Sequence, residues 1–464
     1  MTELDEAQRL LRALSREKKP LEKNDQYFEG VQPLRFIAPV LEKELGFRLS
    51  PIVLNLALFA VDVYDNRLDI EGFRIGANRK DRAADNDVED VWEENLGGFI
   101  SQQAHREGLA LSRAYAMVGP AESEDDAPPI TIESPFDAIH ENDPKTKKVK
   151  HGIKTWTDLD KTRWMTYCHQ DGSVTWFRKG NEWKESESDT HDFGICSLVP
   201  LINDARLLGR ALPGKFDQRL GRSVFHPIIS PLDALNKMAS DMMVSGEFHA
   251  LPRRWGTGLT EDDFIDEKTG EALDTFSMIA GRMWGTTSDK AKFGQFPEAD
   301  LSNFHNTMKL LMQIVAMQLG LPGSYLLFQG DNPPSADAIR ASEAQLVKRA
   351  ERKQATLSTG WETVQRLVLL ELGRDQDAKP RMIETLWRDP STPTIAQKAD
   401  AIVKLVQAKD ATGRSLLPIE QAREDLGYTE GQQGRMADWD AEAQRSPQLT
   451  DAMRALNDVP AGGQ

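Results

Sequence analysis

The sequence predicts a mixed α+β fold, with strand-forming segments concentrated in its first half and long helices in its second half. Within residues 1–200, segments with helical apolar spacing alternate with short runs in which every second residue is apolar. From Pro227 onward the spacing is mainly helical and the segments are longer. A chain of 464 residues also has the length of about two to four domains.

The N-terminal segments predict two helices and a strand. Glu3–Arg16 carries leucines at the spacing of an amphipathic helix. Gln26–Gly30 is a short aromatic segment that ends in a turn residue, and Pro51–Asn66 is strongly apolar and predicts a buried helix. Arg67–Phe73 alternates with a period of two, which is typical of a strand.

The next segments predict a helix, two strands and a hairpin. Asp87–Gly108 has helical spacing, with an apolar stripe formed by Val88, Val91, Trp92 and Leu96. Ala114–Gly119 and Pro129–Glu133 have strand-like composition. Two aromatic runs, at 164–167 and 174–177, flank Asp171-Gly172, and this spacing predicts a β-hairpin.

The second half predicts three long helices. Ser230 followed by Pro231 predicts an N-cap and a helix that runs to His249. Asp300–Leu319 predicts a second helix, and Ser335 caps a third that extends to Leu372. The third helix would be roughly 54 Å long, with a kink or break expected at Gly360. A short strand at 382–388 and a helical block at 394–410, 418–426 and 430–444 follow.

Composition excludes several classes of protein. The formal charge of −16 and a pI near 5.1 argue against a protein that grips duplex DNA by neutralising its phosphates. Two cysteines imply no disulfide framework. The N-terminal residues lack a signal-peptide pattern and the longest apolar run is too short to span a bilayer, so we expect a chain made in the cytoplasm with no membrane contact.

The motifs of common enzyme classes are absent from the sequence. It contains no Gly-x-x-x-x-Gly-Lys-Ser/Thr, which excludes a P-loop ATPase, and no Gly-x-Gly-x-x-Gly or Gly-x-Ser-x-Gly. Cys168, His169, His191 and Cys196 are the one candidate set of zinc ligands. Their spacing matches no familiar zinc finger, and adjacent residues of a strand point to opposite faces. We therefore expect no metal site, no cofactor and no enzymatic activity.

Two charged clusters are candidate contact surfaces. Lys348, Arg349, Arg352 and Lys353 form i, i+4 pairs on the third helix and stand out in an acidic chain. They are either a contact for another subunit or DNA, or ordinary solvated helix surface. The acidic residues between the first two helices have no calcium-loop pattern, so a solvated face is the simpler interpretation; they are Glu261, Asp262, Asp263, Asp266 and Glu267.

The order of these segments resembles the portal family of tailed bacteriophages, and in particular its siphophage, SPP1-like branch. The local matches are spread over nearly the whole chain. They are Tyr27-Phe28-Glu29-Gly30, Arg67-Leu68 through Gly72-Phe73, the run Ile229–Asn236, the run Asn332–Ile339 and the run Ala396–Ala401. The run that begins with Asn332-Pro333-Pro334-Ser335 is the most diagnostic.

The resemblance implies a portal fold whose segments have separate roles. In chain order, they are an α/β wing (1–226), a stem helix (227–250), a small clip (251–297), a second stem helix (298–319), a tunnel loop (320–334), a long helix behind the tunnel (335–372), a wing return strand (373–393) and a helical crown with a C-terminal tail (394–464). It also implies a channel-lining group, namely Gln329, Gly330, Asp331, Asn332 and Ser335. The acidic cluster would then be a docking surface of the clip.

The function implied by the resemblance is structural. A ring of about twelve subunits would stand at one vertex of the virion capsid and conduct double-stranded DNA during packaging and ejection. Its partners would be the terminase large subunit, a head-tail adaptor, and the major capsid and scaffolding proteins, with assembly in the host cytoplasm. Two other functions are compatible with the sequence: a metal-dependent hydrolase that uses either the Cys/His set or the acidic residues of 261–267, and a monomeric protein-binding scaffold.

Overall fold

The protein is described from a computed structural model. The structure describes residues 2–35, 52–76, 83–121, 123, 126–207, 218–250, 254–258, 292–295, 301–326, 335–379, 382–391, 395–410, 413–428 and 432–441. The chain divides into two compact units, Met1–Pro390 and Ser391–Gln464. In its described residues the first unit contains two antiparallel sheets, two further strand pairs and most of the helices, which confirms the predicted mixture of helices and sheets.

Helix α1, Glu3–Glu29, is longer than the sequence predicts. It begins with a capping box, in which the Asp5 N–H donates to Thr2 Oγ1 at 3.2 Å and the Thr2 N–H donates to the Asp5 carboxylate at 2.9 Å. The helix continues through Pro20 because its second half also has a buried face, formed by Leu21 and Tyr27. It ends at Gly30, whose φ of 73° suits the left-handed cap.

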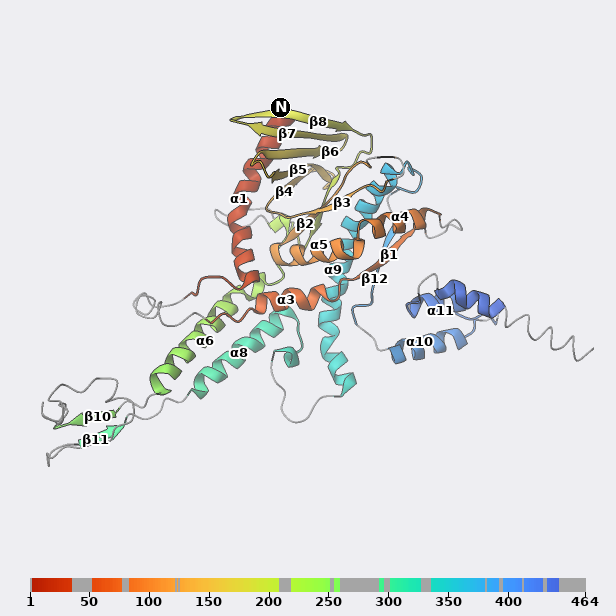
Figure 1. Ribbon diagram of the computed structural model, residues 1–464. Coiled ribbons are helices and arrows are strands. Elements are labelled where there is room, and N and C mark those ends of the chain that lie inside the picture. The colour runs from red at the N-terminus through yellow and green to blue at the C-terminus, as the bar shows by residue number, and fades with distance from the viewer. Residues whose placement is uncertain are drawn as a thin grey trace, which may run out of the picture. The chain divides into compact units, whose positions relative to one another are not determined.

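The first half of α1 packs on a five-stranded antiparallel sheet (Figure 1). The strands are β4 (Ala138–Asn142), β5 (Val149–Thr157), β6 (Arg163–His169), β7 (Gly172–Lys179) and β8 (Glu182–Thr190), in that order. Leu10 and Leu14 of α1 are buried with Ile153 and Met165 of the sheet. The predicted hairpin around Asp171-Gly172 is confirmed as the β6–β7 connection.

A three-stranded sheet forms the centre of the unit, with the order β3-β2-β9. Its strands are β2 (Arg113–Val118), β3 (Ile130–Glu133) and β9 (Leu198–Ile202), so the strands predicted at 114–119 and 129–133 are confirmed. The helix predicted at 87–108 is wrong as a single element. It is split into α4 (Ala83–Glu94) and α5 (Gly97–Leu111) at Leu96, which has a φ of 54° and is 67% exposed instead of joining the apolar stripe.

A mainly apolar core joins segments from both ends of the unit. Helix α3, Leu56–Asp65, leads into β1, Ile70–Ile75, which pairs antiparallel with β12, Ile383–Trp387. The strands predicted at 67–73 and 382–388 are therefore both present, as β1 and β12. At the centre of the core, the fully buried Trp361 ring meets Trp92 edge-on at 5.3 Å and donates a 2.9 Å hydrogen bond to His105 Nε2.

Helices α6, Ile229–Ala250, and α8, Ser302–Leu319, lie side by side (Figure 1). Between them in the sequence is a strand pair, β10 (Arg254–Thr257) with β11 (Lys292–Gln295). The N-cap predicted at Ser230 is wrong. Helix α6 begins one residue earlier, directly after a 3₁₀ turn at His226–Ile228, because the buried Phe225 and Ile228 already hold this segment in a helical turn.

The long helix α9, Ala336–Glu371, is confirmed at its expected length of 36 residues. Ser335 caps it, since its hydroxyl accepts from the Ala338 N–H at 3.2 Å. The break expected at Gly360 does not occur. A Cβ at Gly360 would lie 2.4 Å from Leu201 Cδ2, so the glycine allows α9 to approach β9 closely.

The second unit is helical, as predicted. It contains α10 (Ile395–Gln407), α11 (Ile419–Asp425) and a further helix at 432–441. Arg423 of α11 pairs with Asp440 at 2.6 Å, which joins the last two of these helices. Across the described parts of both units, no helix combines the length and hydropathy needed to cross a membrane.

Candidate functional site

A basic pocket of about 340 Å³ lies beside the middle of α9. Its walls come from α9 and from four other places in the chain: the end of β9 with the two residues after it, the segment 222–227, the C-terminal end of α8, and Tyr64 in α3. Three of the four basic residues singled out from the sequence line it, namely Arg349, Arg352 and Lys353. This pocket is the candidate functional site.

One wall of the pocket depends on a glycine with left-handed backbone. Gly221 has a φ of 93°, and a Cβ there would lie 2.5 Å from the Ser112 carbonyl oxygen, so this position requires glycine. The close approach places Arg222 against Asn203. Their backbones hydrogen bond at 2.9 Å, and the Asn203 side-chain amide donates to the Arg222 carbonyl at 2.6 Å. The cationic Arg222 side chain is thereby held at the pocket beside Asp204, with which it pairs.

Lys353 is a half-buried cation of the pocket. Its Nζ donates to Asn203 Oδ1 at 2.5 Å and lies 5.0 Å from the centroid of the Tyr64 ring. Both contacts are favourable for an ammonium group, but neither is a counter-charge. Burial lowers the pKa of Lys353 to about 8, with Asp204 opposing the shift and Arg349 adding to it.

Arg349 fixes the C-terminal end of α8. Its Nη1 donates to the Gln318 carbonyl at 2.8 Å, where a cation also offsets the negative end of the helix dipole. The neighbouring Leu319 carbonyl accepts from the Tyr64 hydroxyl. Gly320 then ends α8 with a φ of 71°, and its missing side chain leaves room for the Arg349 guanidinium.

The basic cluster predicted from the sequence divides between two environments. Arg352 is exposed at the rim of the pocket. Lys348 is exposed elsewhere on α9, outside the pocket lining, and pairs with Glu351 at 2.5 Å. Among the described residues that line the pocket, four are cations and only Asp204 is a carboxylate, so the pocket has a marked excess of positive charge.

The predicted channel-lining group is described only in part. Gln329, Gly330, Asp331 and Asn332 lie outside the described residues, whereas Ser335 is the N-cap of α9. The segment before them is attached to α9 through Tyr325. The Tyr325 hydroxyl donates to Glu343 Oε1 at 2.6 Å and accepts from Arg67 at 3.1 Å. The five acidic residues of the predicted clip surface also lie outside the described residues.

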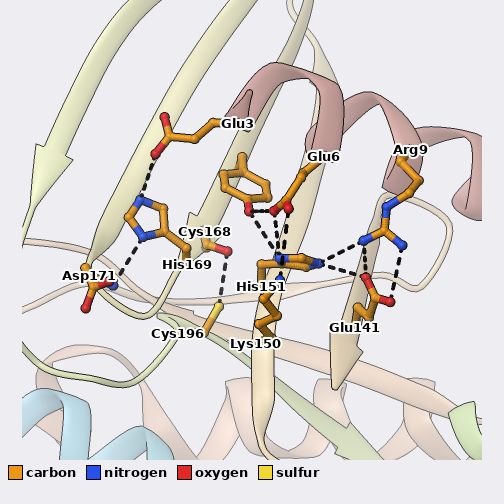
Figure 2. A network of polar contacts seen from close by, with 11 residues as sticks. Glu3, Glu6, Arg9, Glu141, Lys150, His151, Cys168, His169, Asp171 and Cys196 are labelled. Carbon is orange, nitrogen blue, oxygen red and sulfur yellow. Dashed lines mark hydrogen bonds and ion pairs between the residues drawn. The ribbon is translucent and has the colours of Figure 1, made fainter. Parts of the chain in front are cut away.

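The candidate zinc ligands do not converge; Figure 2 shows three of the four, Cys168, His169 and Cys196. Cys168 and Cys196 are buried, and the Cys196 thiol donates to the Cys168 carbonyl oxygen at 3.5 Å. Burial raises the pKa of Cys168 to about 11, which disfavours the thiolate that a metal needs. His169 points to the other face of the strand toward Glu3, at 3.6 Å, and His191 stacks on Phe193. Within the described ranges, no three His, Cys, Asp or Glu side chains are placed to hold a metal ion.

Comparison with known families decides between the functions compatible with the sequence. Residues 7–446 match the family model described as phage portal protein, SPP1 Gp6-like. The chain belongs to this phage portal protein family. Two relatives named portal protein agree: that of Mycobacterium phage D29 is 30% identical over 434 residues, and that of Mycobacterium phage L5 is 29% identical over 436 residues. Each match covers 91% of this chain and 85% of the relative.

Two solved structures of particle necks also align with the chain. They are the neck of an empty GTA particle, with 13% identity and a TM-score of 0.45, and the neck of a native GTA particle, with 12% identity and a TM-score of 0.42. The alignments cover 86% and 84% of this chain, and 96% and 93% of the aligned chains.

Membership of the portal family gives the chain a structural role in the virion, so the hydrolase alternative is not favoured. The family does not by itself account for the basic pocket. Sequence reasoning identified the α9 side of the pocket from its charge pattern but missed Tyr64, Asn203, Arg222 and Gln318. The one signal near them is a pair of glycines, Gly221 and Gly320, each beside a wall of the pocket.

Proposed function

We propose that the chain assembles head-to-tail into a ring of about twelve copies at one capsid vertex, through which double-stranded DNA passes during packaging and ejection. The observation that carries the ring is the apolar surface left uncovered on the paired helices α6 and α8. On α8, Leu310 is 56% exposed and Met317 is 68% exposed, and on α6 Met243 is 50% exposed. Leu310 and Met317 are seven residues apart and therefore share a face of α8.

This apolar face is not the one by which α8 packs within its own chain. Val315 and Leu319 are buried on the opposite side of the helix. A helix with apolar groups on both sides needs partners on both sides. In a closed ring each subunit meets two neighbours through two different surfaces, so a neighbouring copy supplies the second partner.

The segment roles belong to the same proposal. Residues 1–226 with the strand near 383–387 would be the wing, where the major capsid and scaffolding proteins bind. The α6/α8 pair would be the stem, and residues 251–297 the clip. The second unit would be the crown. The support for the wing is the β1–β12 pairing, which joins the two parts of the chain assigned to it.

Passage of DNA without capture agrees with the charge of the chain. A net charge of −16 repels phosphates at short range, within a Debye length of about 8 Å at physiological salt. Residues 329–332 are proposed to meet the DNA. On one side of these residues, Tyr325 hydrogen bonds to Glu343 of α9, and on the other side Ser335 caps the start of α9. A force on residues 329–332 would therefore be transmitted to the long helix.

The clip residues Glu261, Asp262, Asp263, Asp266 and Glu267 are proposed as the acidic surface that docks the terminase large subunit and later a head-tail adaptor. Support comes from their position in the sequence, between β10 and β11, which are themselves between the two stem helices. The ring would assemble in the host cytoplasm and become part of the virion.

The ring is tested by placing charge on the exposed face of α8. The double change Leu310→Glu and Met317→Glu should abolish rings, because two carboxylates would be buried in the subunit contact. His305→Glu is the matched control, since His305 is exposed on a different side of α8. Mass measurement in solution should find rings for the control and single 52.0 kDa chains for the double variant. Rings of unchanged mass in the double variant would contradict the proposed contact.

A further inference from the structure

The basic pocket contains more positive charge than its own walls neutralise. Arg222 pairs with Asp204, whereas Arg349 and Lys353 make contacts to neutral groups, namely the Gln318 carbonyl and the Asn203 amide oxygen. Arg352 adds a further charge at the rim. A partly buried cation is costly unless an anion compensates it. The charge balance of the pocket is therefore incomplete in the single chain, as far as the described residues go.

The size and shape of the pocket limit what can complete it. A cavity of about 340 Å³ has room for a side chain or two but not for a folded element. Arg349, Arg352 and Lys353 all line this space. Guanidinium forks and an ammonium group are the donors that bind carboxylates through short, charge-assisted hydrogen bonds.

We propose that the pocket receives an aspartate or glutamate side chain of the neighbouring copy of this chain. The inference rests on the proposed ring, because only a neighbour held at a fixed position can place a carboxylate there. A head-to-tail contact pairs two different surfaces, so the pocket on one copy and the acidic side chain on the next need not resemble each other. The chain carries 73 acidic residues, so the complementary charge is abundant on its surface.

A protein carboxylate fits the pocket better than a phosphate of duplex DNA does. Lys353 lies inside the pocket over the Tyr64 ring, and its Nζ is held there by Asn203. A side chain from a neighbouring subunit can extend into such a recess. Duplex DNA, with a persistence length of about 50 nm, is stiff at this scale and presents its phosphates on a convex surface. It would reach the exposed Arg352 more readily than Lys353.

The test is a zero-length cross-link within the assembled ring. Rings are formed from equal amounts of unlabelled and ¹⁵N-labelled chains and treated with a carbodiimide, which joins an amine to a touching carboxylate as an amide with loss of water. Peptides that contain Lys353 are then identified by mass spectrometry. A link that combines one labelled and one unlabelled peptide must connect two subunits.

We expect Lys353 to be linked to one aspartate or glutamate of a second chain in rings, and to lose this link when the subunits are separated before treatment. Lys348 is the internal control, since it pairs with Glu351 and should link only within its own chain. Lys353→Arg should form rings normally but give no link. Lys353→Met should raise the chain concentration needed for half-assembly about tenfold.

Two results would overturn the inference while leaving the ring intact. One is a ring in which Lys353 stays unlinked or links only to Asp204 of its own chain. The other is protection of Lys353 from a separate, amine-acylating reagent solely when duplex DNA occupies the ring, which would assign the pocket to DNA. If no rings form at all, the proposed function fails and the inference fails with it.

Discussion

The contact between α1 and the five-stranded sheet differs from the basic pocket in how charge is balanced. At α1, the buried His151 lies between two carboxylates, with Nε2 2.8 Å from Glu141 and Nδ1 3.2 Å from Glu6 (Figure 2). Arg9 also pairs with Glu141, and Glu6 accepts from the Tyr167 hydroxyl at 2.6 Å. Arg9 and His151 therefore each meet a carboxylate of their own chain.

The pocket beside α9 has the opposite balance. One of its cations, Lys353, meets an amide oxygen and an aromatic ring. In the α1 contact, charges are compensated within one chain and the contact stabilises the fold. In the pocket, we propose that a carboxylate of a neighbouring copy supplies the missing negative charge. A portal subunit needs both kinds of region. It must fold as a single chain, and it must also have surfaces whose favourable interactions form only when subunits assemble.

The largest expected effect is on the α1 contact. Leu14 is buried with Ile153 and Met165, so Leu14→Ala should lower the free energy of unfolding of the isolated chain by about 2–5 kcal/mol. Leu310→Ala is the control, because this leucine is exposed in the single chain and its loss should cost less than about 0.5 kcal/mol. Denaturant unfolding measures both, and equal losses would show that α1 is not part of the folded core.

The next largest expected effect is a loss of folding stability at low pH. Burial lowers the pKa of His105 and of His140 to about 3, below the ordinary 6.5, so unfolding takes up protons and stability falls as the pH drops below 6.5. Each histidine should lower the free energy of unfolding by roughly 2 kcal/mol when the pH falls from 7.5 to 5. His105→Gln cannot take up this proton, so unfolding measured at both pH values should show a smaller loss in that variant. A loss as large as in the unchanged chain would argue that His105 already titrates normally when folded.

The smallest effect has the opposite pH dependence and belongs to the pocket. The folded pKa of Lys353, about 8, lies below the ordinary 10.5, so its charge costs stability at neutral pH and the cost fades as the pH rises from 8 to 10.5. Lys353→Met should stabilise the isolated chain by about 1 kcal/mol at pH 7, after allowance for solvent near the pocket mouth. The gain should shrink by pH 10 in thermal unfolding. A variant that is less stable than the unchanged chain at pH 7 would contradict the uncompensated charge.

Local signals in the sequence were sufficient for elements whose determinants lie within a few residues. The Asp171-Gly172 hairpin and the Ser335 cap of α9 are of this kind. The break at Leu96 and the continuation of α1 through Pro20 depend on tertiary burial, which a local pattern does not contain. The pocket is the extreme case, because the Lys353–Asn203 contact joins residues 150 positions apart.

The mass of the purified assembly tests the central claim most directly. We predict closed rings of about twelve 52.0 kDa chains, visible by microscopy as a single class of annular particle with a central opening. A chain that stays monomeric at every protein and salt concentration would contradict both the ring and the interpretation of its uncovered surfaces.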